Sequence, residues 1–143
     1  MEGQTIFNDN QYGATSLLMI NNGNNSFTDG TTQFGLYYIH NTFQGVLVDV
    51  DQDDWLDLVV AHDTGEIRTY KNNGGTSFTM INNPSTDKFA YPMGIAGADY
   101  NNDGLIDFFF SNTGSSVPEF IARGDLRDEQ VYVKEWMLFA NHG

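Results

Sequence analysis

The sequence predicts an all-β protein, a partial β-propeller built from four-stranded antiparallel blades. Two acidic segments carry this prediction, because residues 49–57 return fifty residues later as residues 99–107. Both segments fit the pattern D-x-[DN]-x-D-x-x-x-D, and short apolar runs lie before and after each of them. The composition agrees, since 15 glycines and an aromatic share of 14% accompany few helix signals.

Each acidic loop has the donor atoms of a calcium site. Ca²⁺ takes six to eight oxygen ligands at roughly 2.3–2.6 Å, and oxygen-bearing side chains stand at positions 1, 3, 5 and 9 of both loops. The alternative is a pair of polar turns with solvated carboxylates, but so many acids within nine residues repel one another without a cation. We therefore expect two bound Ca²⁺ ions, in a structural rather than a regulatory role. The candidate ligands are Asp49, Asp51, Asp53 and Asp57 in the first loop and Asp99, Asn101, Asp103 and Asp107 in the second.

An EF-hand shares the start of this pattern but differs at position 12. That position carries a bidentate Glu in an EF-hand, whereas it falls on Val60 and Phe110 here. The flanking runs are also too short for helices and are rich in β-branched and aromatic residues. Each loop is therefore expected to connect two antiparallel strands.

The repeat divides the chain into three parts of a single β-propeller segment, residues 1–143. Strands at 43–49, 56–62, 66–71 and 77–81 are expected to form a complete blade within residues 36–85, with the first calcium loop. Residues 1–35 are the end of a preceding blade, because their Asn-Asn-Gly turn and a following Phe recur 51 residues later. Residues 86–143 are an incomplete blade with the second calcium loop, an inserted loop at 114–133 and a strand at 136–139.

The number of blades is too small to close a ring, because propellers need four to eight. The chain is therefore expected to be part of a longer protein or, as the less favoured alternative, a subunit that self-associates through open blade edges and forms an oligomer.

Composition excludes several classes of function. The net charge of −13 opposes binding to nucleic acid, which needs clustered Lys and Arg. No run of 18 apolar residues predicts a membrane span, and the absence of Cys excludes a disulfide framework. Weak calcium loops suit an extracellular, cell-surface or periplasmic setting. The first residues lack the features of a signal peptide, so one is expected upstream of residue 1.

These motifs resemble those of the FG-GAP/VCBS repeat proteins, whose blades build the propeller of integrin α-subunits. The resemblance runs from about Leu17 to the end of the chain. It is strongest for bacterial UnbV/ASPIC-type, cartilage-acidic-protein-like members. The segments that carry it are Pro92-Met93-Gly94-Ile95-Ala96, Ala122-Arg123-Gly124-Asp125-Leu126-Arg127 and Leu138-Phe139-Ala140-Asn141.

The resemblance also implies the remaining metal ligands. The eight side chains named above correspond to the ligands of the family, and the backbone carbonyls of Trp55 and Leu105 would occupy position 7. One departure is Asp54 at position 6, where the family prefers Gly. Glycine accepts a positive φ more easily than Asp does, so the second site is expected to be the better formed.

Other short motifs have simpler explanations. Asp63-Thr64-Gly65 matches the aspartic-protease tripeptide, but a hairpin turn explains it and no second copy exists in the chain. Arg123-Gly124-Asp125 matches the integrin-recognition tripeptide, which often occurs by chance. The three His residues share no metal-like spacing. Most aromatic residues are expected in the core, whereas Trp55 in the first loop is expected to be partly exposed.

The expected function is non-catalytic: a calcium-binding repeat scaffold for extracellular adhesion or for recognition of a protein or glycan. No convergent acid and base suggest an enzyme. The alternatives are a propeller lectin, in which exposed Trp55 contacts a sugar, and a non-catalytic part of a polysaccharide-active enzyme. The identity of the protein or glycan ligand is not written in the sequence.

Overall fold

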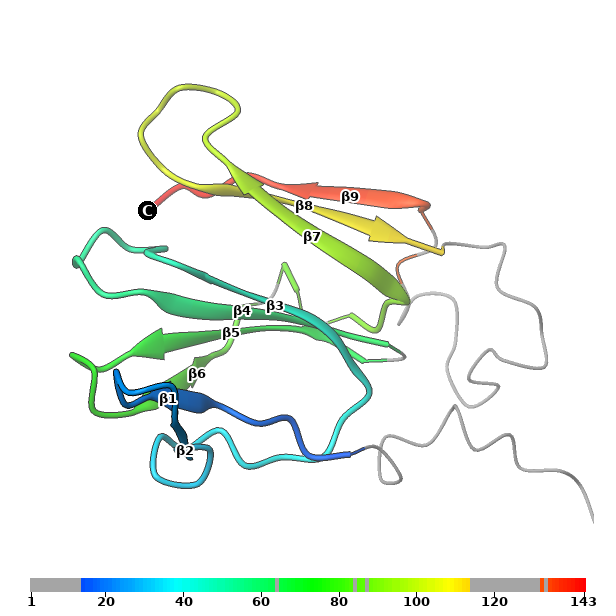
Figure 1. The fold of residues 1–143 in the computed structure, drawn as a ribbon. Helices are drawn as coiled ribbons and strands as arrows, with labels where there is room; N and C mark the ends of the chain where they lie inside the picture. Colours follow the sequence, from blue (N-terminus) through cyan, green and yellow to red (C-terminus); the bar gives the residue numbers. More distant parts are fainter. Residues whose placement is uncertain (1–13, 64, 84, 87, 114–131, 133) are drawn as a thin grey trace, which may run out of the picture.

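The computed structural model describes residues 14–63, 65–83, 85–86, 88–113, 132 and 134–143. Within these residues the chain is all-β and forms three antiparallel sheets, each a simple up-and-down meander (Figure 1). Their order along the chain is a first sheet of two strands, a middle sheet of four and a third sheet of three. The strands are β1 (Met19–Asn21), β2 (Phe27–Asp29), β3 (Thr42–Val48), β4 (Asp57–His62), β5 (Ile67–Asn72), β6 (Phe78–Ile81), β7 (Pro92–Ala98), β8 (Asp107–Asn112) and β9 (Trp136–Phe139).

The middle sheet has the order β3-β4-β5-β6, and each of its strands lies within one residue of the bounds expected from the sequence. Strand β3 alternates half-buried and exposed side chains, as a strand at the edge of a sheet does. Strand β4 is buried along nearly all its length, because its run of Val and Ala is covered on both faces. The acidic loop therefore connects an edge strand to the most buried strand of the sheet.

The third sheet repeats the pairing of the middle sheet with an offset of fifty residues. Val48 faces Asp57 across β3 and β4, and Ala98 faces Asp107 across β7 and β8. Both pairs also shift register at the same place, next to Phe43 and next to Met93. A β-bulge at matched positions indicates that the two sheets are copies of one structural unit.

The first sheet repeats the β5-β6 hairpin with an offset of 51 residues. Asn21 faces Phe27 in the first hairpin, and Asn72 faces Phe78 in the second. The turns use the same bonds: the backbone N–H of Asn22 donates to the Ser26 carbonyl at 3.0 Å, and the corresponding bond at residues 73 and 77 is 2.8 Å long. The sequence repeat is therefore also a repeat of hydrogen bonds.

The three sheets are stacked one above another in the order of the chain (Figure 1). One buried cluster fills the space between the middle and third sheets. A second, smaller cluster lies on the other face of the middle sheet, against residues 18–38. The first cluster comprises Val59, Ala61, Ile67, Ala90, Ile95, Phe108, Phe110 and Met137, and the second comprises Leu36, Val60 and Tyr70.

The expectation of an all-β chain with antiparallel sheets is confirmed, whereas the assignment of these sheets to propeller blades stays a prediction. Most of the insertion expected at 114–133, including the Arg-Gly-Asp tripeptide, lies outside the described residues. Among the residues that the structure describes, no helix has the length and apolar character that crossing a bilayer requires.

Candidate metal centre

The first acidic loop is held in shape by its own carboxylates. The Asp49 side chain accepts hydrogen bonds from the backbone N–H groups of Asp53, at 3.1 Å, and Asp54, at 2.9 Å. The Asp53 carboxylate accepts the N–H of Trp55 at 3.0 Å. These bonds curl the backbone around the side chain at position 1. Of the acidic side chains in the loop, those of Asp49, Asp51 and Asp57 converge, whereas Asp53 is not part of that group.

The second loop has the same bonds at positions fifty residues later. Asp99 accepts from the N–H groups of Asp103, at 3.1 Å, and Gly104, at 2.9 Å, and Asp103 accepts from Leu105 at 2.9 Å. Asn101 adds two bonds to Asp103, one from its amide group and one to the backbone N–H. The two loops therefore share one backbone conformation, although their sequences differ at positions 2, 3, 4, 6, 7 and 8.

Both loops place positions 4 and 6 in the left-handed region. In the first loop Gln52 has φ of 61° and Asp54 has φ of 69°; in the second, Asn102 has φ of 60° and Gly104 has φ of 88°. Only glycine adopts this conformation without a steric cost. The expectation that Asp54 takes a positive φ at position 6 is thus met, and the first loop carries more backbone strain than the second.

Three acidic side chains of the first loop converge. Asp49, Asp51 and Asp57 each offer one carboxylate oxygen, and these oxygens lie within 4.8 Å of one another. Two ligands on opposite sides of a Ca²⁺ ion are roughly 4.6–5.2 Å apart, because each bond is roughly 2.3–2.6 Å long. The donor set is oxygen only, which suits a hard cation. The residues present therefore fit calcium.

The aspartates at position 9 are buried and belong to the sheets. Asp57 is 0% exposed and Asp107 is 1% exposed. Asp57 accepts the N–H groups of Val50, at 3.0 Å, and Asn72, at 2.7 Å. A carboxylate has about four lone-pair sites, so these two bonds orient Asp57 and leave acceptor capacity for a metal.

An asparagine at the end of the third strand completes each loop, and the sequence analysis missed it. The N–H of Asn72 donates to Asp57, and the N–H of Asn141 donates to Asp107 at 2.8 Å in the same way. The signal was present in the sequence, because Asn72-Asn73-Gly74 has a counterpart in Asn141-His142-Gly143. Its contact with position 9, however, depends on the pairing of β4 with β5 and of β8 with β9.

Lys71 is a second residue that the sequence analysis missed. Its ammonium group donates to Oδ2 of Asp51 and, at 2.8 Å, to Oδ2 of Asp53. These hydrogen bonds, with Asp51 first, raise the pKa of Lys71, and the bond from Lys71 lowers the pKa of Asp53. The ammonium therefore already provides positive charge at two of the predicted ligands.

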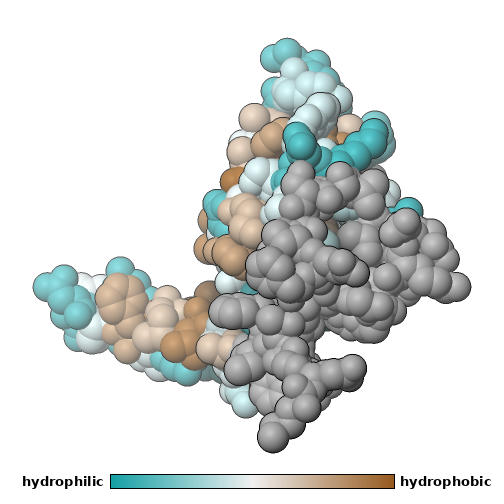
Figure 2. Space-filling model, turned by 90° about the vertical axis from the view of Figure 1, so that its right-hand side faces the viewer, coloured by the Kyte–Doolittle hydropathy of each residue, from teal (hydrophilic) through white to brown (hydrophobic). Residues whose placement is uncertain are grey.

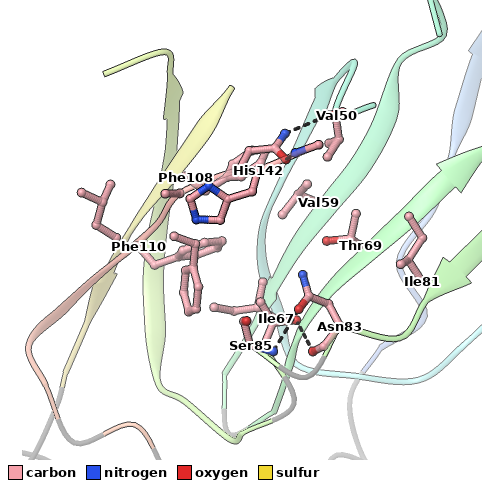
Figure 3. A pocket seen from close by; sticks show the side chains of 16 residues that line it. Val50, Val59, Ile67, Thr69, Ile81, Asn83, Ser85, Phe108, Phe110 and His142 are labelled. Carbon is pink, nitrogen blue, oxygen red and sulfur yellow. Dashed lines mark hydrogen bonds between the residues drawn. The ribbon is translucent and has the colours of Figure 1, made fainter. Parts of the chain in front are cut away.

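The two loops contact each other. The side-chain amide of Gln52 donates to the Gly104 carbonyl at 2.7 Å. The side-chain amide of Asn141 donates to the Val50 carbonyl at 2.8 Å, which is the dashed line at Val50 in Figure 3. Because Asn141 also bonds Asp107, a chain of hydrogen bonds connects the position-9 aspartate of one loop to the backbone of the other.

A cavity of about 520 Å³ lies between the middle and third sheets, beside these loops (Figure 3). Apolar side chains from both sheets point into it, among them Val59, Ile67 and Phe110, and Asn83 adds a polar group. His142 is the one titratable side chain among the described residues that line it. This lining has no acid and base pair that would indicate catalysis.

Two of the three histidines lie together, although their spacing in the sequence indicated nothing. The rings of His40 and His62 are stacked, with centroids 4.5 Å apart. Burial, followed by the charges of His40 and Arg68, lowers the pKa of His62 to about 3, and burial also lowers the pKa of His40. Nδ1 of His40 and Nε2 of His62 are buried without a hydrogen-bond partner in the described part of the chain.

Trp55 is exposed, as expected. Its side chain is 46% exposed, and one edge of the ring packs against Gly75 in the β5-β6 turn. Thr64 of the Asp-Thr-Gly tripeptide lies outside the described residues.

Comparison with known proteins agrees with the repeated loops. The sequence model of the FG-GAP-like repeat matches residues 49–110, from the start of the first loop to the strand after the second. Residues 49–110 are therefore similar to FG-GAP-like repeats. The matched region contains both acidic loops, so the resemblance to FG-GAP repeats noted in the sequence is confirmed.

The chain is also similar to cartilage acidic protein 1. It is 30% identical to the mouse protein over 111 residues, 31% to the Xenopus tropicalis protein over 120 and 32% to the human protein over 114. These alignments cover 75–79% of the chain but only 17–18% of each relative. The chain thus spans less than a fifth of the length of these relatives.

Proposed function

We propose that the chain is a calcium-stabilised, non-catalytic segment of a β-propeller that serves adhesion or recognition outside the cell. The observation that carries this proposal is the converging carboxylates of the first loop, held by a backbone conformation that the second loop repeats. The family match at residues 49–110 supports it, because it covers both loops.

The proposed ligands are the side chains at positions 1, 3, 5 and 9 and the carbonyl at position 7 of each loop. A bound Ca²⁺ would offset the crowded negative charge and connect the ends of two strands that the loop joins. The backbone N–H groups hold Asp49 and Asp57 in place before an ion arrives. Preorganisation of this kind lowers the cost of binding.

The stacking of the sheets supports the propeller assignment. Phe109 and Trp136 lie on the outer face of the third sheet, where they are 42% and 60% exposed. By the repeat, these positions correspond to Val59 and Ile67, which are buried under the next sheet. Apolar residues also gather in the lower half of Figure 2, the level at which β1 and β2 lie in Figure 1. We propose that further sheets of the same kind cover both ends of the stack.

The extracellular setting is part of the proposal. Calcium loops on extracellular modules are weak and need the calcium levels found outside cells. The name of the relatives, cartilage acidic protein 1, points to an extracellular matrix tissue. The ligand of the scaffold, a protein or a glycan, is left open, as is self-association through open strand edges.

Calcium binding is tested by calorimetry and thermal unfolding of the chain in calcium, in magnesium and in chelator. We expect two binding events with calcium and a higher unfolding temperature, since a ligand that binds the folded state stabilises it by mass action. A double variant, Asp49→Ala with Asp99→Ala, should lose both effects. Equal unfolding temperatures in calcium and in chelator would disprove the proposal.

Glycan binding is a second candidate, which the exposure of Trp55 favours. An aromatic ring beside Asp and Asn side chains is a suitable platform for a sugar. A glycan-array signal that is lost in Trp55→Ala but kept in a variant of exposed Trp136 would support this candidate over a protein ligand.

A further inference from the structure

The first acidic loop is bonded by a lysine side chain, and the second loop has no lysine at the corresponding position. Lys71 is the last residue but one of strand β5, and its ammonium bonds Asp51 and Asp53, positions 3 and 5 of the first loop. The corresponding residue is Ala140, directly after β9, because Asn72 and Asn141 make the same bond to their loops. The second loop therefore has no counterpart of this ammonium at that position.

The loop that is bonded by Lys71 is also the more acidic of the two. The first loop has five aspartates between residues 49 and 57, whereas the second has three between residues 99 and 107. Asn101 replaces one of the acids and bonds Asp103 through its amide, so a neutral group does in the second loop what Lys71 does in the first. The more acidic loop thus has the built-in counterion.

We propose that Lys71 competes with calcium for the first loop, so that the two loops of one chain bind calcium with different affinities. This inference rests on the proposed calcium function. The ammonium bonds one oxygen, Oδ2, of each of two proposed ligands, so an ion that takes these oxygens must displace Lys71. The Lys71 side chain is partly exposed, which lets the ammonium move into water when it leaves.

If Lys71 competes with calcium, its side chain has opposite effects in the absence and in the presence of the ion. Without calcium, Lys71 offsets the repulsion among the loop aspartates and stabilises the fold. With calcium, it is an opposing charge that has to leave. Replacing Lys71 by Met should therefore lower the unfolding temperature in chelator and raise the affinity of the first loop for calcium. A purely structural ion pair would produce only the first effect.

Terbium luminescence can report chiefly on the first loop. Tb³⁺ binds oxygen sites that take Ca²⁺ and emits when a nearby indole absorbs light, and Trp55 stands inside the first loop. Trp136 pairs with Ser111, at the end of β8 away from Asp107 and the second loop. Trp55→Phe should therefore remove most of the indole-sensitised emission. Calorimetry with Ca²⁺ reports both loops together.

The decisive comparison is a titration of the wild-type chain, Lys71→Met, Lys71→Arg and Lys134→Met. We expect the Tb³⁺ midpoint of the Trp55 signal to fall roughly three- to tenfold in Lys71→Met, the scale of one or two exposed ion pairs. Lys71→Arg keeps the cation and should titrate close to wild type. Lys134→Met changes the net charge equally but lies outside the loops and should not shift the midpoint.

Different results would overturn the competition by Lys71 and the calcium function. An unchanged midpoint in Lys71→Met, with normal calcium binding by calorimetry, would overturn the competition and leave the calcium function intact. No binding of Ca²⁺ or Tb³⁺ by wild type or Lys71→Met would overturn both. If Lys71→Met does not fold without calcium, Lys71→Gln, which keeps a donor but no charge, gives the same comparison.

Discussion

At the scale of single residues, the buried histidines make the fold sensitive to acid. His62 is fully buried and its pKa is lowered to about 3, so the folded state holds the neutral ring. The unfolded chain takes up a proton near pH 6.5. Protonation of His62 therefore does not reduce the free energy of unfolding above about pH 6.5, and it reduces this free energy progressively as the pH falls from 6.5 toward 3.

We expect the free energy of unfolding to fall by up to about 1.4 kcal/mol per pH unit for each such histidine below pH 6.5. Urea unfolding at constant calcium between pH 7 and pH 5 measures this slope above the range where most carboxylates titrate. His62→Gln should unfold more easily at pH 7 but with a flatter dependence on pH. A slope equal to that of wild type would assign the acid sensitivity to other groups.

Two neighbouring glycines provide a second test at this scale. Gly74 and Gly75 both have positive φ, of 64° and 74°. A Cβ on Gly74 would meet no atom within 4 Å, whereas one on Gly75 would lie 2.7 Å from the Trp55 ring. We expect Gly74→Ala to cost about 1 kcal/mol, the strain of the backbone alone, and Gly75→Ala about 2–3 kcal/mol. Equal losses in chemical denaturation would mean that the Trp55 ring moves freely.

At the scale of elements, each acidic loop depends on three strands: the two strands that it connects and the next strand along the chain. The carboxylates at positions 1 and 9 accept backbone N–H groups in both loops, and Asn72 or Asn141 adds the bond from the third strand. A loop is therefore formed fully only when three strands have paired. This arrangement couples metal affinity to the folding of the sheet.

The two loops should differ in their response to loss of position 5. Asp103 bonds Leu105 and Asn101, all within its own loop, whereas one oxygen of Asp53 is bound to Lys71. We expect Asp103→Ala to remove more of the calcium-dependent gain in unfolding temperature than Asp53→Ala. Equal losses would contradict the ranking of the second site above the first.

At the scale of the whole molecule, stability depends on the contact between the middle and third sheets. Phe110 is 1% exposed within that contact, and its neighbour Phe109 points to the other face of β8 and is 42% exposed. Phe110→Ala should cost about 3–5 kcal/mol, the usual range for a buried aromatic. Phe109→Ala should cost less than about 1 kcal/mol when unfolding is measured in the same buffer.

If the outer face of the third sheet binds a further copy of the chain, Phe109 becomes buried in the assembly, and the difference in cost between Phe110→Ala and Phe109→Ala becomes smaller. Light scattering on a sizing column, with calcium and then with chelator, measures the mass. A discrete multimer that needs calcium and is lost in Phe109→Ala would indicate that copies of this chain stack through that face. A calcium-independent monomer would instead favour cover by other repeats of the same kind.

Much of the fold and of the candidate site was predictable, because the signals are local. Strand period, turn residues and the nine-residue acidic pattern each act over a few residues, and the repeat at fifty residues tied them to one unit. The strand bounds of the middle sheet followed to within one residue. The positive φ at Asp54 followed as well, since the position in the loop demands it.

Only the tertiary structure decided the contacts between elements. Lys71 reaches Asp51 because β5 pairs with β4, and no local pattern relates residues twenty apart. The stacking of His40 on His62 and the bond from Asn141 to Val50 likewise need register and sheet packing. The sequence by itself therefore determined the repeat, the strands and the acidic loops. The sheet arrangement decided which cation lies in the first loop and which histidines lose their charge, because long-range proximity is a property of the folded chain.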